Sequence, residues 1–327
     1  MNEVLDLSLF RRHGGRVRAA EALFPSAPRP WLDLSTGINP RAYPAPRPAR
    51  EDFARLPEPE AIVELEAAAA AVFGAKPEQV AATPGTDAAL RLLPRLLGAR
   101  STAIAQLTYG GHREAWRAAG AEILPGDADA EVRVVVNPNN PDGKLVAPEA
   151  LITAAKRRWV IVDEAFVDSQ PTASVASQAV GRLLVLRSFG KFYGLPGVRL
   201  GFVVGDPNLA QEVRRAFGDW PVSAEALLAG RAAYADTAWQ ACSRARLDRD
   251  RRRLDHLLSG AGLEVVGGTD LFRLARAKDA EAIFLQLASA GVLCRPFEEP
   301  DLLRFGLPDT RADWRRLVDA LCKGHFR

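Results

Sequence analysis

Lys191 is the residue of this chain best placed for covalent chemistry. It lies in the segment SFGKFYGLPGVRLG, residues 188–201, directly after the apolar run 183–186. An amine at the end of a buried strand can attack an aldehyde, and a hydroxyl and a guanidinium nearby can bind a phosphate on the same molecule. Ser188, three residues earlier, and Arg199, eight residues later, supply these groups. A glycine-rich surface turn with an ordinary solvated lysine is the alternative.

Two adjacent acids, Asp163 and Glu164, follow another candidate buried strand, residues 159–162. In α/β proteins, ligands bind at the carboxyl ends of parallel strands. A carboxylate at such an end can pair with a protonated ring nitrogen, because a charge-assisted hydrogen bond favours the ionised pair. An N-cap of a following helix is the alternative use of an aspartate at this place.

Three loops carry further candidates. Asn140 lies in NPNNPDG, residues 137–143, after the apolar run 132–136, and Tyr109 lies in LTYG, residues 107–110. Gly85 and Thr86 precede a predicted helix, so their backbone N–H groups can bind a phosphate at the positive end of its dipole. A proline-locked turn and an ordinary helix cap are the alternatives.

Taken in this order, the motifs resemble the active-site segments of the fold-type I pyridoxal-phosphate enzymes, the aspartate-aminotransferase superfamily. The resemblance implies that Lys191 holds pyridoxal 5'-phosphate as an imine. It also implies that Asp163, rather than Glu164, pairs with the pyridine nitrogen. The other implied cofactor-binding residues are Asn140 at the phenolic oxygen, Tyr109 stacked on the ring, and Gly85, Thr86, Ser188 and Arg199 around the phosphate.

Four positions depart from the pattern of that superfamily. Phe166 replaces a tyrosine that donates to the phenolic oxygen, and Gly190 replaces a serine or threonine beside the phosphate. Asp142 stands where a threonine is usual. Leu56 stands where many relatives have the tyrosine that reaches the partner subunit's cofactor. These departures predict a looser hold on the cofactor.

Segments outside the shared cofactor motifs are more selective. HGG at 13–15, LDLSTGINP at 32–40, DEAFVD at 163–168, WPVS at 220–223 and DTAWQ at 236–240 resemble the L-threonine O-3-phosphate decarboxylases of cobalamin biosynthesis. The histidinol-phosphate aminotransferases are the alternative. The first resemblance implies decarboxylation to (R)-1-amino-2-propanol O-2-phosphate, with Lys191 or Tyr193 returning a proton to Cα. The implied substrate-binding residues are Arg304 at the carboxylate, Gly37 and Asn39 beside it, and His13 and Arg295 at the phosphate.

The composition is that of a globular protein. Of its 327 residues 48% are hydrophobic, and 43 basic residues nearly balance 40 acidic ones, without a basic block for nucleic acid. The three cysteines lack the spacing of a disulfide framework or a metal site. Neither a basic leader nor an apolar run of about 18 residues occurs. We therefore expect a cytoplasmic protein that binds neither membrane nor nucleic acid.

Short apolar runs alternate with helical segments, a pattern that predicts an α/β fold around a mostly parallel sheet. Helices are expected over 61–73 and 87–97, ended by Gly74 and Gly98. After Pro221, a long stretch rich in Ala, Arg and Leu runs to about Leu258 and is ended by Gly260. The proline-rich stretch 25–59 predicts an extended arm.

We expect an N-terminal arm over 1–45, a large cofactor-binding domain over 46–240 and a small α+β domain over 241–327, to which the arm is joined. The resemblance implies a homodimer. A nicotinamide enzyme is disfavoured because no Gly-x-Gly-x-x-Gly follows a predicted strand. A cofactor-sensing regulator would need about 60 further residues for a DNA-binding domain.

Overall fold

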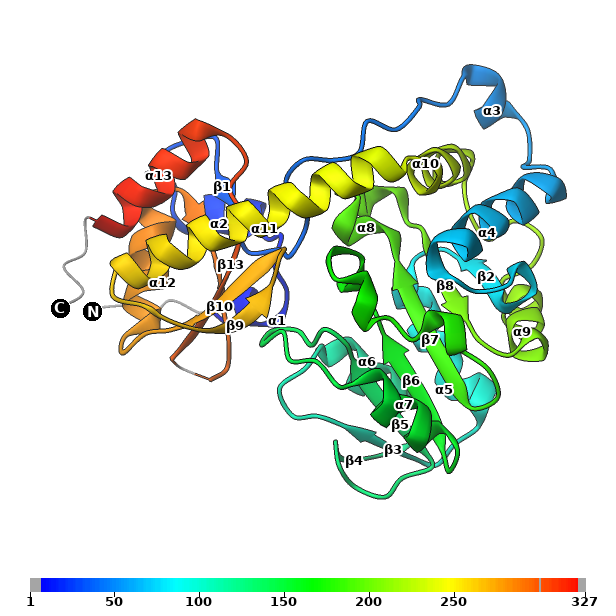
Figure 1. Cartoon of the computed structure of the whole chain (residues 1–327). Helices are drawn as coiled ribbons and strands as arrows, with labels where there is room; N and C mark the ends of the chain where they lie inside the picture. The colour runs from blue at the N-terminus through cyan, green and yellow to red at the C-terminus, as the bar shows by residue number, and fades with distance from the viewer. Residues whose placement is uncertain (1–6, 300, 323–327) are drawn as a thin grey trace. The chain divides into compact units, whose positions relative to one another are not determined.

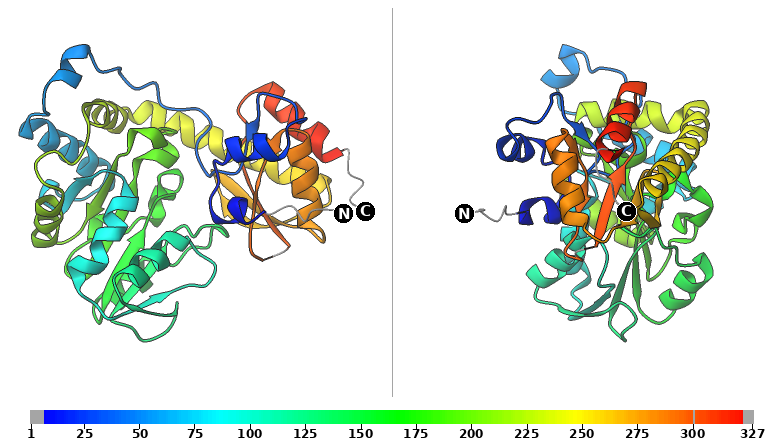
Figure 2. Two further views of the ribbon diagram at one scale, coloured as in Figure 1. Left: turned by 180° about the vertical axis from the view of Figure 1, so that it is seen from behind. Right: turned by 90° about the vertical axis from the view of Figure 1, so that its left-hand side faces the viewer.

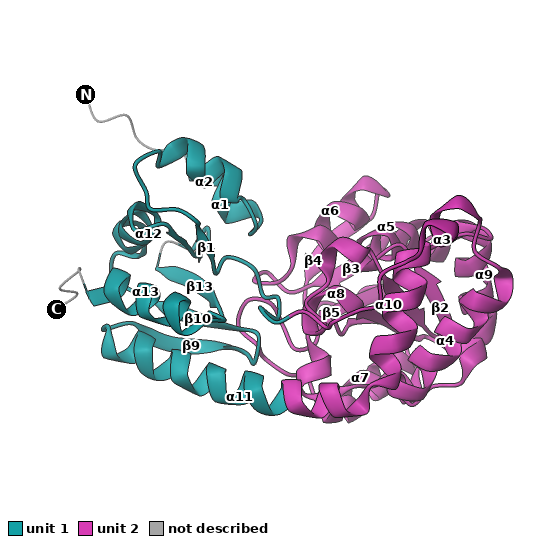
Figure 3. Ribbon diagram, turned by 90° about the horizontal axis from the view of Figure 1, so that it is seen from above, with its two compact units in different colours: residues 1–41, 244–327 teal, residues 42–243 magenta. Residues whose placement is uncertain are grey.

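The computed structural model describes residues 7–299 and 301–322. Residues 1–6, on which the expectation of no basic leader depends, lie outside the described residues. The chain forms two compact units, one of residues 42–243 and one of residues 1–41 with 244–327 (Figure 3). We call them the large unit and the small unit. Within the described ranges, we find no helix with the length and hydropathy needed to cross a bilayer.

The large unit is built on a seven-stranded sheet with the order β2-β8-β7-β6-β5-β3-β4 (Figure 1). β8 pairs antiparallel with both β2 and β7, and the remaining pairs are parallel. Every strand except β8 therefore runs in one direction, which confirms the predicted α/β fold. The strands are β2 (Val80–Thr83), β3 (Ser101–Ile104), β4 (Glu122–Pro125), β5 (Val132–Val136), β6 (Trp159–Asp163), β7 (Leu183–Ser188) and β8 (Gly201–Val204).

Helices cover both faces of this sheet (Figures 1 and 2). Because side chains alternate along a strand, Val134, Ile161 and Leu186 pack in the core under one helical layer. Phe202 contacts the opposite layer through Phe73, with ring centroids 5.6 Å apart. The first layer holds α5 (Thr86–Leu97), α6 (Gly110–Ala118) and α9 (Pro207–Phe217). The second holds α4 (Pro59–Phe73) and α7 (Pro148–Ala155), with α10 (Ala224–Ala235) packed on α4.

Short helical segments complete the large unit. They are α3 (Arg50–Ala54), α8 (Phe189–Phe192) and the 3-10 turns η1 (Pro77–Gln79), η2 (Val167–Ser169), η3 (Pro171–Ala173), η4 (Ala176–Gln178) and η5 (Pro196–Val198). The predicted ends of α4 and α5 are confirmed. Gly74 and Gly98 adopt φ of 66° and 60°, the left-handed conformation that glycine reaches without the strain of a Cβ.

The structure adds detail to three parts of the chain. The stretch after Pro221 forms two helices: α10 ends at Ala235, and α11 (Thr237–Gly260) follows after Asp236. The proline-rich arm is not wholly extended, since it contains the helix α3, although its short strand β1 (Leu32–Asp33) is extended. Strands β2 and β4 were not predicted. β2 reads Val-Ala-Ala-Thr, and alanine has a low strand propensity, so its pairing with β8 decides its conformation.

The small unit holds a four-stranded antiparallel sheet with the order β12-β13-β10-β9, beside the parallel pair of β1 and β11. Arg295 of β12 lies directly opposite Arg304 of β13 in its register. The strands are β9 (Glu264–Thr269), β10 (Phe272–Arg276), β11 (Val292–Leu293), β12 (Arg295–Pro296) and β13 (Leu302–Gly306). The helices are α1 (Ser8–Arg12), α2 (Val17–Leu23), α12 (Ala280–Ser289), α13 (Arg311–Cys322) and most of α11.

Candidate active site

The carboxyl edge of the large sheet gathers the predicted cofactor residues. Asp163 and Ser188 are the last residues of β6 and β7, and Lys191 follows in α8. Loops after the parallel strands β2, β3 and β5 carry Gly85, Tyr109 and Asn140, and Thr86 is the first residue of α5. Arg199 precedes β8, which starts at this edge because it runs antiparallel. The structure thus brings all eight residues to the edge where α/β sheets bind ligands.

A short connection joins Lys191 to Arg199 along the chain, and a backbone hydrogen bond closes it. The backbone N–H of Phe189 donates to the Leu200 carbonyl at 3.2 Å. Arg199 itself has φ of 58°, a left-handed conformation that non-glycine residues seldom adopt. Its guanidinium lies over Gly85, where a Cβ would come within 2.6 Å of Nη2. Gly85 therefore leaves space beside a cation at the start of α5, as a phosphate cradle needs.

Buried aromatic rings hold the short helix α8. Tyr193 stacks on Phe189 at 4.6 Å and on Trp239 at 5.7 Å between ring centroids, and only 1% of Tyr193 is exposed. Lys191 is half-buried, and its Nζ lies 5.8 Å from the centroid of the Phe166 ring. The aromatic packing fixes the helix that carries the amine.

Asp163 is a buried carboxylate with two partners. His112 Nε2 lies 2.8 Å from its Oδ2, and the backbone N–H of Ala165 donates to Oδ1 at 3.0 Å. His112 comes from α6, on the helical layer that also packs over Ile161. Strand alternation points Asp163 to that same layer. A carboxylate held from two sides can present a fixed hydrogen-bond acceptor.

Glu164, the alternative carboxylate, points to the opposite face of the sheet. It accepts hydrogen bonds from Ser174 Oγ at 2.6 Å and from the Val175 N–H at 2.7 Å, and it forms an ion pair with Arg187 at 3.4 Å. Burial raises the pKa of Glu164, against the opposing effect of Arg187. Consecutive residues at a strand end point to opposite faces, so only one of the two acids can serve a ligand beside α6.

The loops that carry Tyr109 and Asn140 are joined. Thr108 Oγ1 and Asn139 Oδ1 lie 2.6 Å apart, and Asn139 Nδ2 donates to the Leu107 carbonyl at 3.0 Å. The unusual Asp142 takes part, because its Oδ1 accepts from Asn139 Nδ2 at 2.7 Å. Burial raises the pKa of Tyr109, which keeps its phenol neutral. An aspartate here closes the loop rather than contacting a phosphate.

Local packing explains a second departure, Gly190. A Cβ at Gly190 would lie 2.7 Å from Pro196 Cα, closer than real contacts come. A serine or threonine cannot occupy this position while Pro196 stays in place. The departures Phe166 and Leu56 lie in opposite surroundings. Phe166 is buried, with 4% of its surface exposed, whereas Leu56 is 64% exposed.

The predicted substrate residues gather in the small unit. Arg304 is 3% exposed, its Nη2 donates to the Ser35 carbonyl at 2.7 Å, and its guanidinium lies 4.9 Å from the Phe272 ring centroid. Burial lowers the pKa of Arg304 well below its usual range, and neighbouring Arg295 adds to the effect. Arg295 Nη2 donates to the carbonyls of Arg11 and Arg12. A buried cation, Arg304, beside a half-buried one, Arg295, favours an anionic ligand.

Glycines allow three backbone segments to approach each other in the same unit. A Cβ at Gly14, next to His13, would lie 2.3 Å from the Ser35 carbonyl oxygen, and one at Gly306 would lie 2.4 Å from that of Thr36. Gly37 follows directly. The structure therefore places His13 and Gly37 in segments that contact one another.

Asn39 is nearly fully buried, with 2% exposed. Its Oδ1 accepts hydrogen bonds from the N–H of Arg41 at 3.1 Å and from Arg246 Nη2 at 2.7 Å. Its side chain is thereby oriented by protein groups.

His112, Arg187 and Arg246 contact candidate site residues, yet the motifs gave them no role. His112 is one of only four histidines and follows Tyr109 by three residues. On a helix that spacing places two side chains on one face, and their ring centroids lie 5.9 Å apart. This spacing was the signal that could have found His112. Arg246 lies more than 200 residues from Asn39 along the chain, so no local pattern reveals it.

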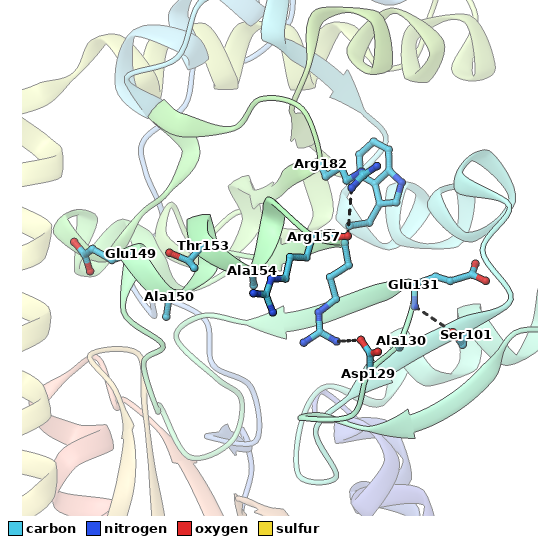
Figure 4. Close-up of a pocket in the computed structure, with 12 residues that line it drawn as sticks. Ser101, Asp129, Ala130, Glu131, Glu149, Ala150, Thr153, Ala154, Arg157 and Arg182 are labelled. Carbon is cyan, nitrogen blue, oxygen red and sulfur yellow. Dashed lines mark hydrogen bonds and ion pairs between the residues drawn. The ribbon is translucent and has the colours of Figure 1, made fainter.

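A large cavity of about 1100 Å³ lies elsewhere, at the amino ends of β3 and β6 (Figure 4). It is open and lined by both acids and bases, among them Asp129, Glu131, Arg157 and Arg182. Size alone does not identify the site, because every predicted cofactor residue lies at the opposite edge of the sheet.

The amine, acid, amide and phosphate cradle at the carboxyl edge fit pyridoxal phosphate. A family model described as aminotransferase class I and II matches residues 31–321. The threonine-phosphate decarboxylase of Pseudomonas aeruginosa is 39% identical over 94% of this chain and 96% of its own length. The threonine-phosphate decarboxylase of Sinorhizobium sp is 40% identical over 95% of this chain and 97% of its own length. Histidinol-phosphate aminotransferase 2 of Gluconobacter oxydans is 31% identical over 87% of this chain and 88% of its own length.

The fold is shared with solved structures. Histidinol-phosphate aminotransferase from Sinorhizobium meliloti, in complex with pyridoxal-5'-phosphate, matches with a TM-score of 0.78 and 20% identity, over 94% of this chain and 92% of that one. This confirms the fold type predicted from the motifs. Both in sequence and in architecture, the chain belongs to the aminotransferase class I and II family.

Proposed function

We propose that this protein is a pyridoxal-phosphate-dependent enzyme that decarboxylates L-threonine O-3-phosphate to (R)-1-amino-2-propanol O-2-phosphate. One observation carries the choice of reaction. Two threonine-phosphate decarboxylases are 39% and 40% identical over 94% and 95% of the chain, whereas a histidinol-phosphate aminotransferase reaches 31% over 87%. The selective segments at 13–15 and 32–40 favour the same reaction.

The cofactor would be held at the carboxyl edge of the large sheet. Pyridoxal phosphate, when bound, supplies an electron sink for the pair left at the substrate's Cα. Asp163 would accept a hydrogen bond from the ring nitrogen, and its contact with His112 at 2.8 Å supports this role. The proposed contacts of the other residues are Lys191 with the aldehyde carbon, Asn140 with the phenolic oxygen, Tyr109 with the ring face, and Gly85, Thr86, Ser188 and Arg199 with the phosphate.

The reaction depends on which substituent of Cα stands perpendicular to the cofactor ring, since only that bond can pass its electrons to the ring. A decarboxylase must hold the carboxylate there. We propose that Arg304 binds the carboxylate bidentately, which a planar guanidinium does well, and that Gly37 and Asn39 add contacts. His13 and Arg295 would bind the substrate phosphate. Lys191 then returns the proton to Cα.

We also propose a homodimer in the cytoplasm. Three exposed apolar side chains near the start of α4 support a subunit interface: Phe53, Leu56 and Val63 are 67%, 64% and 61% exposed. Covering such side chains with a second subunit would remove their apolar surface from water, which stabilises a dimer. All three cysteines are free, as a reducing compartment would keep them.

The test is carbon dioxide release from L-threonine O-3-phosphate without any keto acid. The proposal expects release by the parent protein and its loss in Lys191→Ala, while the control Lys156→Ala, an exposed lysine at the end of α7, retains it. If the parent instead transfers an amino group from histidinol phosphate to 2-oxoglutarate and releases no carbon dioxide, the aminotransferase alternative is correct.

A further inference from the structure

A buried ionic network lies beside β6, which ends at Asp163, and β7, which precedes Lys191. Arg187 forms ion pairs with Glu164, at 3.4 Å, and with Asp168. Its exposed fraction is 3%, against 0% for Glu164 and 4% for Asp168. The guanidinium also lies 4.2 Å from the centroid of the Phe73 ring. Three charged side chains are thus withdrawn from water on one face of the sheet.

Hydrogen bonds extend the network into the segment after β6. Ser174 Oγ lies 2.6 Å from Glu164 Oε2 and 3.3 Å from Arg187 Nη1, and the Val175 N–H donates to Glu164 Oε1 at 2.7 Å. Burying charges is costly unless they are paired and hydrogen-bonded. A well-packed apolar cluster would stabilise the fold at least as well. Stability alone therefore gives no reason for charges at this place.

The position of the network along the chain suggests another role. Arg187 immediately precedes Ser188 and lies four residues before Lys191, while Glu164 immediately follows Asp163. β6 and β7 are in register here, with Asp163 opposite Leu186, and the Glu164 N–H donates to the Leu186 carbonyl at 2.9 Å. The Arg187–Glu164 pair therefore joins the ends of two strands at the point where each presents a cofactor residue.

We infer that Arg187 is a positioning residue, which through Glu164 and Asp168 fixes the spacing between the acid at Asp163 and the amine at Lys191. The inference rests on the proposed binding of pyridoxal phosphate. Arg187 itself points away from the ligand, because Leu186 faces the α5 layer and alternation sends Arg187 to the other. It acts by holding backbone rather than by touching the cofactor.

The test compares Arg187→Met with Arg214→Met. Arg214 pairs with buried Glu66 at 2.9 Å, and its Nη2 also contacts the carbonyl of Val80, at the amino end of β2. Both substitutions remove a cation from a buried carboxylate in the large unit. Only Arg187 lies beside Asp163 and Lys191, so Arg214→Met controls for the loss of an ion pair with a buried carboxylate.

Two quantities are measured on each purified protein: the dissociation constant for pyridoxal phosphate by equilibrium dialysis, and the pH midpoint of the bound cofactor's absorbance change. For Arg187→Met we expect a dissociation constant about tenfold or more above the parent's, since small displacements of binding groups are costly, and a shifted midpoint. Arg214→Met is expected to lower the melting temperature yet keep both parental values.

If Arg187→Met does not fold, Ser174→Ala tests the positioning role of Arg187 instead. It removes one neutral link between Glu164 and Arg187 and leaves every charge paired. A roughly two- to tenfold rise in the dissociation constant is expected from the loss of one hydrogen bond. Parental affinity and midpoint in either Arg187→Met or Ser174→Ala would overturn the inference, as would equal changes in Arg214→Met. A parent protein that binds no pyridoxal phosphate would instead contradict the proposed function.

Discussion

His112 Nε2 lies 2.8 Å from Asp163 Oδ2, and the two side chains are 1% and 4% exposed. The contact joins α6 to the end of β6. Water cannot replace a partner at this depth, so the orientation of the carboxylate depends on His112 and on the Ala165 N–H. His112 therefore belongs to the candidate site as a group that orients the acid, although it matches none of the motifs found in the sequence.

Replacing His112 should weaken cofactor binding. In His112→Ala the buried carboxylate loses one partner, which costs about 1–3 kcal/mol and allows Asp163 to reorient. We expect the dissociation constant for pyridoxal phosphate, measured by equilibrium dialysis, to rise about tenfold. His256→Ala is the control, because His256 is exposed on α11. Equal affinities of the two variants would show that His112 does not orient the acid.

Gly190 should not tolerate a side chain. Its Cβ would lie 2.7 Å from Pro196 Cα, whereas a Cβ at Gly197 would meet no atom within 4 Å. We expect Gly190→Ala to lower the free energy of unfolding by about 1–3 kcal/mol, and Gly197→Ala to change it by less than about 0.5 kcal/mol. Urea denaturation measures both. A Gly190→Ala protein as stable as its parent would mean that Pro196 can move aside.

Arg304→Lys should raise KM for L-threonine O-3-phosphate. Lysine keeps the charge but cannot bind a carboxylate bidentately. Loss of one charge-assisted hydrogen bond corresponds to about a tenfold change or more. We expect kcat to change less than KM in the carbon dioxide assay. Arg311→Lys, at the exposed start of α13, serves as the control, and an unchanged KM in Arg304→Lys would assign the carboxylate to another residue.

Glu66 should give a measurable pH dependence to stability. Burial raises its pKa above the usual 4.5, against the opposing effect of Arg214. Between the ordinary and the raised pKa the folded state binds more protons than the unfolded one. This contribution to the free energy of unfolding is therefore complete below pH 4.5 and is lost as pH rises through the raised pKa.

The variant Glu66→Gln has no titratable group at this position. Its free energy of unfolding therefore does not lose this contribution as pH rises. Urea denaturation across pH 4 to 8 should show its stability rising relative to the parent as pH increases. An unchanged or opposite difference between the two proteins would mean that the pKa of Glu66 is not raised.

Local patterns were enough to predict much of this structure. The apolar runs before Asp163 and Ser188 predicted two central strands, and glycine placed the ends of α4 and α5. The motif order predicted which residues meet at the carboxyl edge. These predictions succeed because strand ends and turn residues are encoded within a few positions of the groups they present.

Contacts between distant segments were out of reach. The pairing partner of β2 is β8, more than 100 residues away, and its own four residues give little sign of a strand. The resemblance favoured Asp163 over Glu164, but the contacts that distinguish the two acids come from elsewhere in the chain. Asp163 meets His112 of α6, and Glu164 pairs with Arg187 of β7.

The antiparallel direction of β8 has a consequence for engineering. Because the chain reverses after α8, one short connection of residues 192–198 delivers both Lys191 and Arg199 to the same edge. An insertion in that connection would separate the Lys191 amine from the Arg199 guanidinium, whereas lengthening the exposed turn near Gly181 leaves the connection between them unchanged.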